Sequence, residues 1–209
     1  MARPRQLSRE LIADAALRVG DRVGPQAMTM RQIAAELKCD PMAIYRHFAN
    51  REELLDFVVD LSLADVALPD LGLPWDERVA VIGQAMRDAG ASHPGLTAHM
   101  AARPPLGPNG QRLAGAVLMA LDEGGLPAAM ALHVLQTLIA YLSASLAMTA
   151  QAGGVRDERW TQVMAMFGRL PESSAEAEMF AAGSQEQFEF GLRLLLAGVR
   201  SQATAASGS

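Results

Sequence analysis

Cysteine, aromatic residues and long apolar runs are all scarce in this sequence, and each scarcity excludes a class of protein. Cys39 is the single cysteine, so the chain offers neither an internal disulfide nor a CxxC metal or redox pair. The basic N-terminus lacks the apolar core of a signal peptide, and no window reaches about 18 uninterrupted apolar residues. Hydrophobic residues still make up 50% of the chain, which excludes a disordered polymer. We expect a soluble, cytoplasmic protein.

Positive charge is also scarce when the whole chain is counted. The net charge is -5 and the pI is about 5.4, which disfavours a partner as acidic as a nucleic acid. The charge is unevenly distributed, however. Residues 1–51 hold nine of the 18 basic residues but five of the 23 acidic ones, which gives this segment +4 and the remainder -9. A basic segment on an acidic body is a recognised hint of nucleic-acid binding.

Helix start signals divide the basic segment into four short helices. The capping residues are Ser8, Thr29, Asp40 and Asn50. Thr29 with Gln32, and Asn50 with Glu53, have the spacing of a capping box. Glycine and proline at residues 24–25 end the first of the four helices.

Beyond a linker at residues 69–74 the pattern stays helical, and the expected helices are longer. They are Trp75–Ala91, Gly95–Ala102, Gln111–Glu123, Pro127–Gln151, Glu158–Phe167 and Gln185–Ser201. Ser184 with Gln187 repeats the capping-box signal. The last eight residues are of low complexity and predict a frayed tail. No stretch alternates as a strand does, so the fold class is all-α, with domains at 1–66 and 67–204 and a disordered tail at 205–209.

Residues 32–45 have the layout of a helix-turn-helix. Apolar side chains supply its small core, and Ala34 permits close approach of the two helices. The turn between the helices commonly has glycine where Lys38 stands, and a non-glycine residue held at positive φ costs about 1 to 2 kcal/mol. Cys39 fits the buried position after it, as a small hydrophobe. The apolar core positions are Ile33, Leu37 and Ile44.

The second helix of this unit would read the DNA. Its N-terminus faces the bases, where thymine methyl groups favour apolar contact. Arg31 is a candidate for a bidentate contact to guanine, and Lys38 and Arg46 are candidates for phosphate contacts. The residues expected nearest the groove floor are Pro41, Met42 and Ala43. An N-terminal arm of Arg3, Arg5 and Arg9 either adds backbone contacts or is a solvated tail.

Residues 9–56 closely resemble the N-terminal domain of the tetracycline-repressor (TetR) family of bacterial transcription regulators. The stretch TMRQIAAELKCDPMAIYRHFANREELLD carries the resemblance. It implies that Tyr45 and His47 meet the DNA backbone or bases, that Arg51 contacts a phosphate, and that Arg31 reaches a base edge. The alternative for Tyr45 and His47 is that they only pack the small domain.

The same resemblance implies a larger ligand-binding and dimerisation domain. A single recognition helix reads few base pairs, so a homodimer is expected. In the family two long helices of each subunit form a four-helix interface, which here implies Pro127–Gln151 and Gln185–Ser201. The interface residues expected on them are Leu135, Leu138, Leu142, Phe188, Gly191, Leu195 and Gly198. The two glycines serve equally well for packing within one subunit.

The sequence HMAARP at residues 99–104 resembles a segment of the tetracycline repressor itself. In tetracycline-binding members a histidine like His99 ligates drug-bound magnesium. Ala102 and Ala67 replace the other polar groups of that site, and residues 148–151 contain no acid, so we expect a different effector and no metal or cofactor. The expected apolar cavity is lined by Met86, His99, Met100, Arg103, Met119, His133, Gln136, Thr137 and Tyr141. Each of these residues is an ordinary core residue in the alternative interpretation.

The sequence thus predicts a ligand-responsive repressor that binds a palindromic DNA operator and is released by a small apolar or amphipathic molecule. The stiff connection at residues 103–108 is a candidate for transmitting the signal. One alternative is a constitutive DNA-binding protein without an effector, which the acidic body disfavours. An enzyme is a weaker alternative, because the histidines share no catalytic spacing with a nucleophile or acid. They are His47, His93, His99 and His133.

Overall fold

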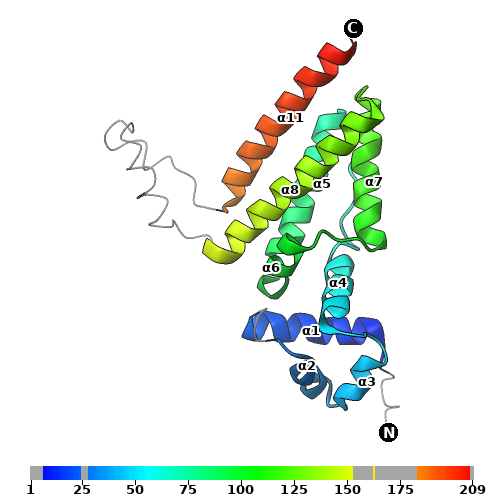
Figure 1. The fold of residues 1–209 in the computed structure, drawn as a ribbon, viewed down its shortest axis with the longest axis vertical. Helices are drawn as coiled ribbons and strands as arrows, with labels where there is room; N and C mark the ends of the chain where they lie inside the picture. The colour runs from blue at the N-terminus through cyan, green and yellow to red at the C-terminus, as the bar shows by residue number, and fades with distance from the viewer. Residues whose placement is uncertain (1–6, 25–27, 153–161, 163–182, 208–209) are drawn as a thin grey trace.

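The computed structural model describes residues 7–24, 28–152, 162 and 183–207, and Figure 1 shows their arrangement. This part of the chain is α-helical and contains no strand, which confirms the predicted class. The predicted helix Glu158–Phe167 lies outside the described residues, apart from residue 162. The helices are α1 (Arg9–Val23), α2 (Met30–Leu37), α3 (Pro41–Tyr45), α4 (Arg51–Ser62), α5 (Trp75–Ala91), α6 (Pro94–Ala102), α7 (Pro108–Glu123), α8 (Ala128–Ala152) and α11 (Gln185–Ser207).

The predicted capping residues begin the four N-terminal helices. The Thr29 hydroxyl accepts from Gln32 N, and the side-chain Oε1 of Gln32 accepts from Thr29 N, so this capping box is complete. At α4 the Asn50 oxygen accepts from Glu53 N at 2.8 Å, but the Glu53 carboxylate accepts from Ala49 N, one residue further upstream. The predicted capping box at Asn50 therefore forms only its first bond, from Glu53 N to Asn50. The Glu53 carboxylate binds Ala49 N instead and fixes the turn before the helix.

The long helices follow the predicted ranges with two corrections. The helix Trp75–Ala91 has the predicted bounds. The helix predicted from Gln111 begins three residues earlier, at Pro108, because proline is harmless in the first turn and a side chain from α4 binds the adjoining amides. The last helix continues to Ser207, so the frayed segment predicted after Ser201 is helical as far as that residue. Its three alanines favour a helix and outweigh its low complexity.

The N-terminal helices enclose a small core of their own. Ile12, Ile33, Ile44 and Leu54 are fully buried in it. Lys38 ends α2 in the left-handed region, at φ 54°, as the turn requires. Cys39, predicted as buried, is half-buried in the same turn. Figure 1 shows this unit at one end of the molecule, with α4 leading from it to α5–α8 and α11.

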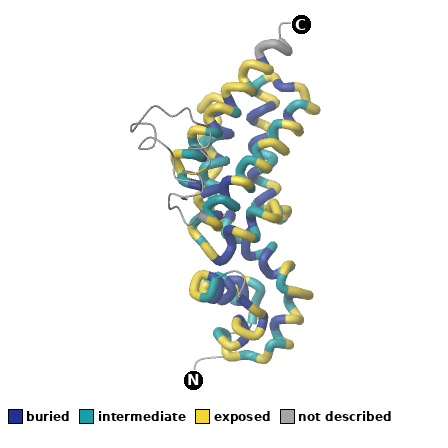
Figure 2. Tube along the Cα trace, turned by 60° about the vertical axis from the view of Figure 1, so that its left-hand side comes forward, coloured by how far each residue is buried: buried dark blue, intermediate teal, exposed yellow. Residues whose placement is uncertain are grey.

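Within helix α8, residues Ala128–Gln151 are long and apolar enough to cross a membrane by length and composition alone. It packs against α5, α6, α7 and α11 in the body of the molecule. Only 22% of its most apolar window is buried within the chain. Part of the surface of α8 is therefore exposed, and Figure 2 shows exposed residues along the helices of the body.

Candidate DNA-binding and effector sites

The recognition helix α3 turns one side chain inward and presents the rest outward. Ile44 is fully buried, whereas Met42 is 64% exposed and Tyr45 is 45% exposed. The exposed part of the Tyr45 side chain is accessible to a partner. The residues that the sequence assigns to DNA are all exposed or half-buried: Arg31, Lys38, Pro41, Met42, Ala43, Tyr45, Arg46, His47 and Arg51.

Two sets of basic residues in the small domain differ in whether they form ion pairs. Arg18 and Arg22 bind Glu36 at 3.3 and 2.9 Å, and the hydrogen bond from Arg22, followed by that from Arg18, lowers the pKa of Glu36. The second set forms no ion pair with any residue in the described part of the chain. Its members lie on or beside α3 and are Arg31, Lys38 and Arg46. The unneutralised positive charge therefore gathers around the recognition helix.

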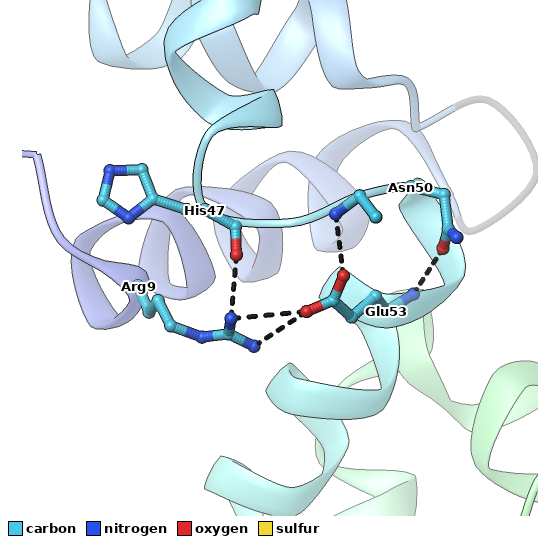
Figure 3. A network of polar contacts seen from close by, with 5 residues as sticks. Arg9, His47, Asn50 and Glu53 are labelled. Carbon is cyan, nitrogen blue, oxygen red and sulfur yellow. Dashed lines mark hydrogen bonds and ion pairs between the residues drawn. The ribbon is translucent and has the colours of Figure 1, made fainter.

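Arg9 is part of the fold of the small domain and not of a DNA-contacting arm. Its guanidinium donates to His47 O at 2.8 Å and to Glu53 Oε1 at 3.3 Å (Figure 3). The same group stacks on the rings of Phe48 and Phe57, with centroid distances of 4.1 and 4.7 Å. These contacts fix the turn that follows α3, and the His47 ring points away from them in Figure 3. The other arm residues, Arg3 and Arg5, lie outside the described residues.

Arg51 also has an internal contact that the sequence did not indicate. Its Nε donates to the backbone oxygen of Met28 at 3.0 Å. Met28 directly precedes the N-cap of α2, so this bond ties the start of α4 to the start of α2. The bond to Met28 holds the Arg51 side chain in place, so a phosphate contact by Arg51 would use a preoriented guanidinium.

The body contains an apolar cavity of about 80 Å³ between α5, α7, α8 and α11, which Met100 of α6 and residues 104–105 also line. Three residues predicted for the effector line it, namely Met86, Met100 and Tyr141. Four residues predicted for the dimer interface line it as well, namely Leu135, Leu138, Leu142 and Phe188. Val79, Ile82, Val117 and Leu146 also line it and escaped prediction because they look like ordinary core residues.

The other residues predicted for the effector lie elsewhere. Met119 is 60% exposed on α7. His133, Gln136 and Thr137 are exposed on α8, away from the cavity. Of the predicted interface residues, Gly191 packs inside the subunit, because an added Cβ would lie 2.1 Å from the Tyr141 hydroxyl oxygen. Gly198 faces open space, and Leu195 is half-buried.

His99 and Arg103 bind a carboxylate of the small domain instead of lining the cavity. His99 Nε2 donates to Asp56 Oδ1 at 2.8 Å. Arg103 binds the same carboxylate with two hydrogen bonds, at 2.9 and 2.8 Å. The Arg103 bonds are the main cause that lowers the pKa of Asp56, so the ion pair persists at neutral pH and is lost only in acid. The three side chains join α6 of the body to α4.

The other end of α6 contacts α1 even more closely. A Cβ added to Gly95 would lie 2.5 Å from the backbone carbon of Gly20, so only glycine fits. The Asp21 carboxylate accepts from Gly95 N at 3.4 Å and lies 3.2 Å from His93 Nδ1. Helix α6 thus contacts the small domain at both its ends, while Met100, between them, lines the cavity.

Helix α4 is also held by α7. The Asp60 carboxylate is buried and accepts from Gly110 N at 2.9 Å and from Asn109 N at 3.3 Å, which caps α7. In return, Arg112 donates to the oxygens of Leu63 and Val66 at the end of α4. Between these contacts, residues 104–105 form one wall of the apolar cavity and also border a groove of about 580 Å³ beside α4.

The family is decided by two models that together span most of the chain. Residues 12–58 match the bacterial regulatory proteins of the tetR family, and residues 68–203 match the tetracyclin repressor-like C-terminal domain. The chain belongs to the TetR family. It is a transcriptional regulator of that family and not an enzyme. The DNA-binding unit and the helical body described above correspond to the two matched regions.

Individual relatives cover nearly the whole chain. An HTH-type transcriptional regulator of Saccharopolyspora erythraea is 24% identical over 94% of this chain and 86% of its own length. Apo ActR of Streptomyces coelicolor is 29% identical over 99% of this chain and 100% of its own, with a TM-score of 0.80, and ActR is also known in complex with actinorhodin. BioQ of Mycobacterium smegmatis is 28% identical over 94% of this chain and 99% of its own, with a TM-score of 0.71, and a BioQ structure contains its double-stranded DNA operator.

Proposed function

We propose that this protein is a homodimeric repressor that binds a palindromic operator and is released from it when a small apolar or amphipathic molecule enters the body cavity. The observation that carries the proposal is the position of α6, which lines the cavity with Met100 and binds the small domain at both its ends. The ActR complex with actinorhodin and the BioQ complex with its operator support the two halves of the proposal. Binding to DNA would place the protein in the cytoplasm.

The DNA half of the proposal assigns each exposed residue of the recognition unit a role. Met42, 64% exposed, would contact thymine methyl groups with Pro41 and Ala43 beside it. Arg31 would bind a guanine edge, and the unpaired charges of Lys38 and Arg46 would bind phosphates. Tyr45 and His47 would contact the DNA backbone or bases, and Arg51 would bind a phosphate. Two such units must be spaced about 34 Å apart to enter successive major grooves, which requires a dimer.

The second copy would cover the exposed surface of α8 and α11. Leu132, Phe190 and Leu194 are 56%, 45% and 59% exposed there. Large side chains exposed together on two long helices mark a protein interface more often than a solvated surface. Ala140, Ala197 and Gly198 lie exposed on the same helices and leave room for close helix approach.

Replacing Leu194 with glutamate is expected to convert the dimer to monomers. The buried charge would have no partner at the interface, which costs several kcal/mol and exceeds what a single hydrophobic contact returns. Sedimentation equilibrium at micromolar protein measures the change. Leu71→Glu is the matched control, because Leu71 is 74% exposed in the linker before α5. A dimeric Leu194→Glu protein would contradict the assignment of this surface.

The size of the cavity indicates how an effector would act. Ligand pockets typically measure about 300 to 1,000 Å³, whereas this cavity measures about 80 Å³. An effector must therefore displace the walls, and among these α6 and residues 104–105 adjoin the small domain. The displaced conformer would hold the recognition helices at a different separation, and the ligand would shift the population towards it.

A gel-retardation assay on the DNA upstream of the protein's own gene tests the proposed function. We expect specific retention at nanomolar dimer and a steep loss of affinity as salt rises, because phosphate contacts release counterions. A duplex of the same composition in scrambled order serves as the control. Equal retention of both duplexes would exclude an operator in this DNA.

A further inference from the structure

Arg87 of α5 is a buried cation with no acidic partner among the described residues. Its exposed fraction is 5%, and no ion pair joins it to an acid in the described part of the chain. Buried charges are normally paired, because desolvation of an unpaired charge is costly. Arg78, the other buried arginine of α5, follows this rule and binds Glu123. Arg87 is the exception among the described residues of the body.

The contacts that hold Arg87 are all neutral, and one of them is redundant. Arg87 Nε donates to Ser145 Oγ at a long 3.4 Å, and Nη2 donates to the backbone oxygen of Gly183 at 2.6 Å. That oxygen also accepts from Thr149 Oγ1 at 2.7 Å, so it keeps a partner without the arginine. The guanidinium lies 5.5 Å from the ring centroid of Phe188. None of these contacts neutralises the charge.

Arg87 lines an open recess and lies beside Phe188, a residue of the apolar cavity wall. The recess measures about 900 Å³ and is lined by Arg87 together with the polar side chains of Thr97, Thr149 and Ser184. Phe188, under the guanidinium, lines the apolar cavity and stacks on Tyr141 with ring centroids 5.3 Å apart. Burial raises the pKa of Tyr141, and the charge of Arg87 acts in the opposite sense, so its field extends to the cavity wall.

The acids on the adjoining turns are solvated and bound to other groups. Asp88 is exposed and accepts from Gln84 Nε2 at 2.8 Å. Glu186 is exposed, and its own backbone amide, then Ser184, lower its pKa, with a smaller contribution from Arg87. The described acids therefore attenuate the charge of Arg87 but do not cancel it, and a carboxylate entering the recess would bind it more directly than any described acid does.

We propose that Arg87 is the anion anchor of the effector site and that the effector is an amphipathic organic acid. Its apolar part would occupy the cavity between α5, α8 and α11, and its carboxylate would bind the Arg87 guanidinium from the recess with two parallel hydrogen bonds. This inference rests on the proposed effector-responsive function. It adds the chemical class of the effector, which the apolar lining alone leaves open.

Paired acids and amides of equal shape test the proposal. The probes are 1-naphthoate against 1-naphthamide and octanoate against octanamide, with the melting temperature of the full-length protein as the readout. We expect each acid to stabilise the protein and to bind at least about tenfold more tightly than its amide, since one charge-assisted pair is worth that much. Equal binding of acid and amide would overturn the proposal, and so would a lack of response to both acids.

The variant Arg87→Met separates an anchor for the effector from a structural arginine. Because the arginine contributes an unpaired charge and a redundant hydrogen bond, the ligand-free variant is expected to melt at or above the temperature of the wild type. The variant should also lose the preference for acids, and Arg87→Lys should retain part of it. Arg18→Met, which removes one exposed charge from the small domain, should leave the preference intact. A lower melting temperature of ligand-free Arg87→Met, or an unchanged preference for acids, would overturn the assignment.

Operator binding, measured in parallel, keeps the two proposals distinguishable. If the acids bind through Arg87 but leave the operator complex intact, the site stands and the effector-responsive function fails. If neutral amides release the operator as well as the acids do, the function stands and the anion anchor fails.

Discussion

Replacing Gly95 with alanine is expected to lower the free energy of unfolding by about 1 to 3 kcal/mol, the range of overpacking substitutions. The added Cβ would lie 2.5 Å from the backbone carbon of Gly20 and 2.9 Å from its oxygen. Backbone atoms do not move aside as a flexible side chain does. The strain must separate α1 from α6, and the hydrogen bond from Gly95 N to Asp21 would be lost with it. Urea denaturation of the variant measures the loss.

Gly115→Ala is the matched control for Gly95→Ala. Gly115 lies within α7, and an added Cβ there meets no atom within 4 Å. Alanine is more favourable than glycine in a helix by about 1 kcal/mol, so this variant should be more stable than the wild type. The two glycine-to-alanine changes thus have opposite expected signs. Stabilisation by both would show that α1 and α6 are not in close contact.

Replacing Asp56 with alanine is expected to abolish most of the effect of an effector on operator affinity. Allosteric couplings commonly change affinity by about 5- to 150-fold, and we expect the variant to retain less than about threefold. The reason is that Asp56 alone receives both His99 and Arg103 from α6. Titration of the operator complex with a compound that binds the body, for wild type and variant, measures the change.

Asp56→Ala should stay folded, which separates coupling from folding. The Asp56–Arg103 pair is 44% and 53% exposed and contributes at most about 1 kcal/mol, and the loss of the acceptor for His99, which is 11% exposed, costs about 1 to 3 kcal/mol. Glu52→Ala removes an exposed acid from the same helix and should retain wild-type coupling. An Asp56→Ala protein that releases the operator as the wild type does would exclude this carboxylate from the signal path.

The parts of the fold that depend on neighbours in sequence were predictable. The N-cap side chains of Ser8, Thr29 and Asp40 bind amides two or three residues ahead of them. The helix bounds and the exposed recognition helix follow from such local chemistry. The positive φ of Lys38 was predictable for the same reason, because the turn geometry sets it.

The faces of the body helices were not predictable, because α8 is apolar on more than one side. Leu135, Leu138 and Leu142 were assigned to the dimer interface but line the cavity, whereas His133 and Gln136, assigned to the effector, are exposed. A helix with apolar side chains on several sides and few polar ones carries no clear signal for its rotation. Packing against α5, α6, α7 and α11 decides it.

The link from α6 to the small domain was equally hidden in the sequence. His99 and Arg103 were assigned to the effector cavity because they lie in the region that resembles the tetracycline repressor. Their partner, Asp56, is more than 40 residues away in the chain and belongs to an amphipathic helix in which an acid is unremarkable. Long-range pairing of this kind leaves no periodic signal. The burial of Arg87 was hidden as well, because its hydrogen-bond partners, Ser145 and Gly183, are far away in the chain.

The most direct test of the account is a comparison of the affinity of one compound for the free protein and for its operator complex. The compound is the one that most raises the melting temperature in a screen of amphipathic molecules. Coupling between two sites is reciprocal, so the operator must weaken the binding of the compound by the factor by which the compound weakens operator binding. We predict equal factors of at least about 5, the lower end of known couplings. A compound that binds in the body with the same Kd for the free protein and for the operator complex would contradict an effector-responsive repressor.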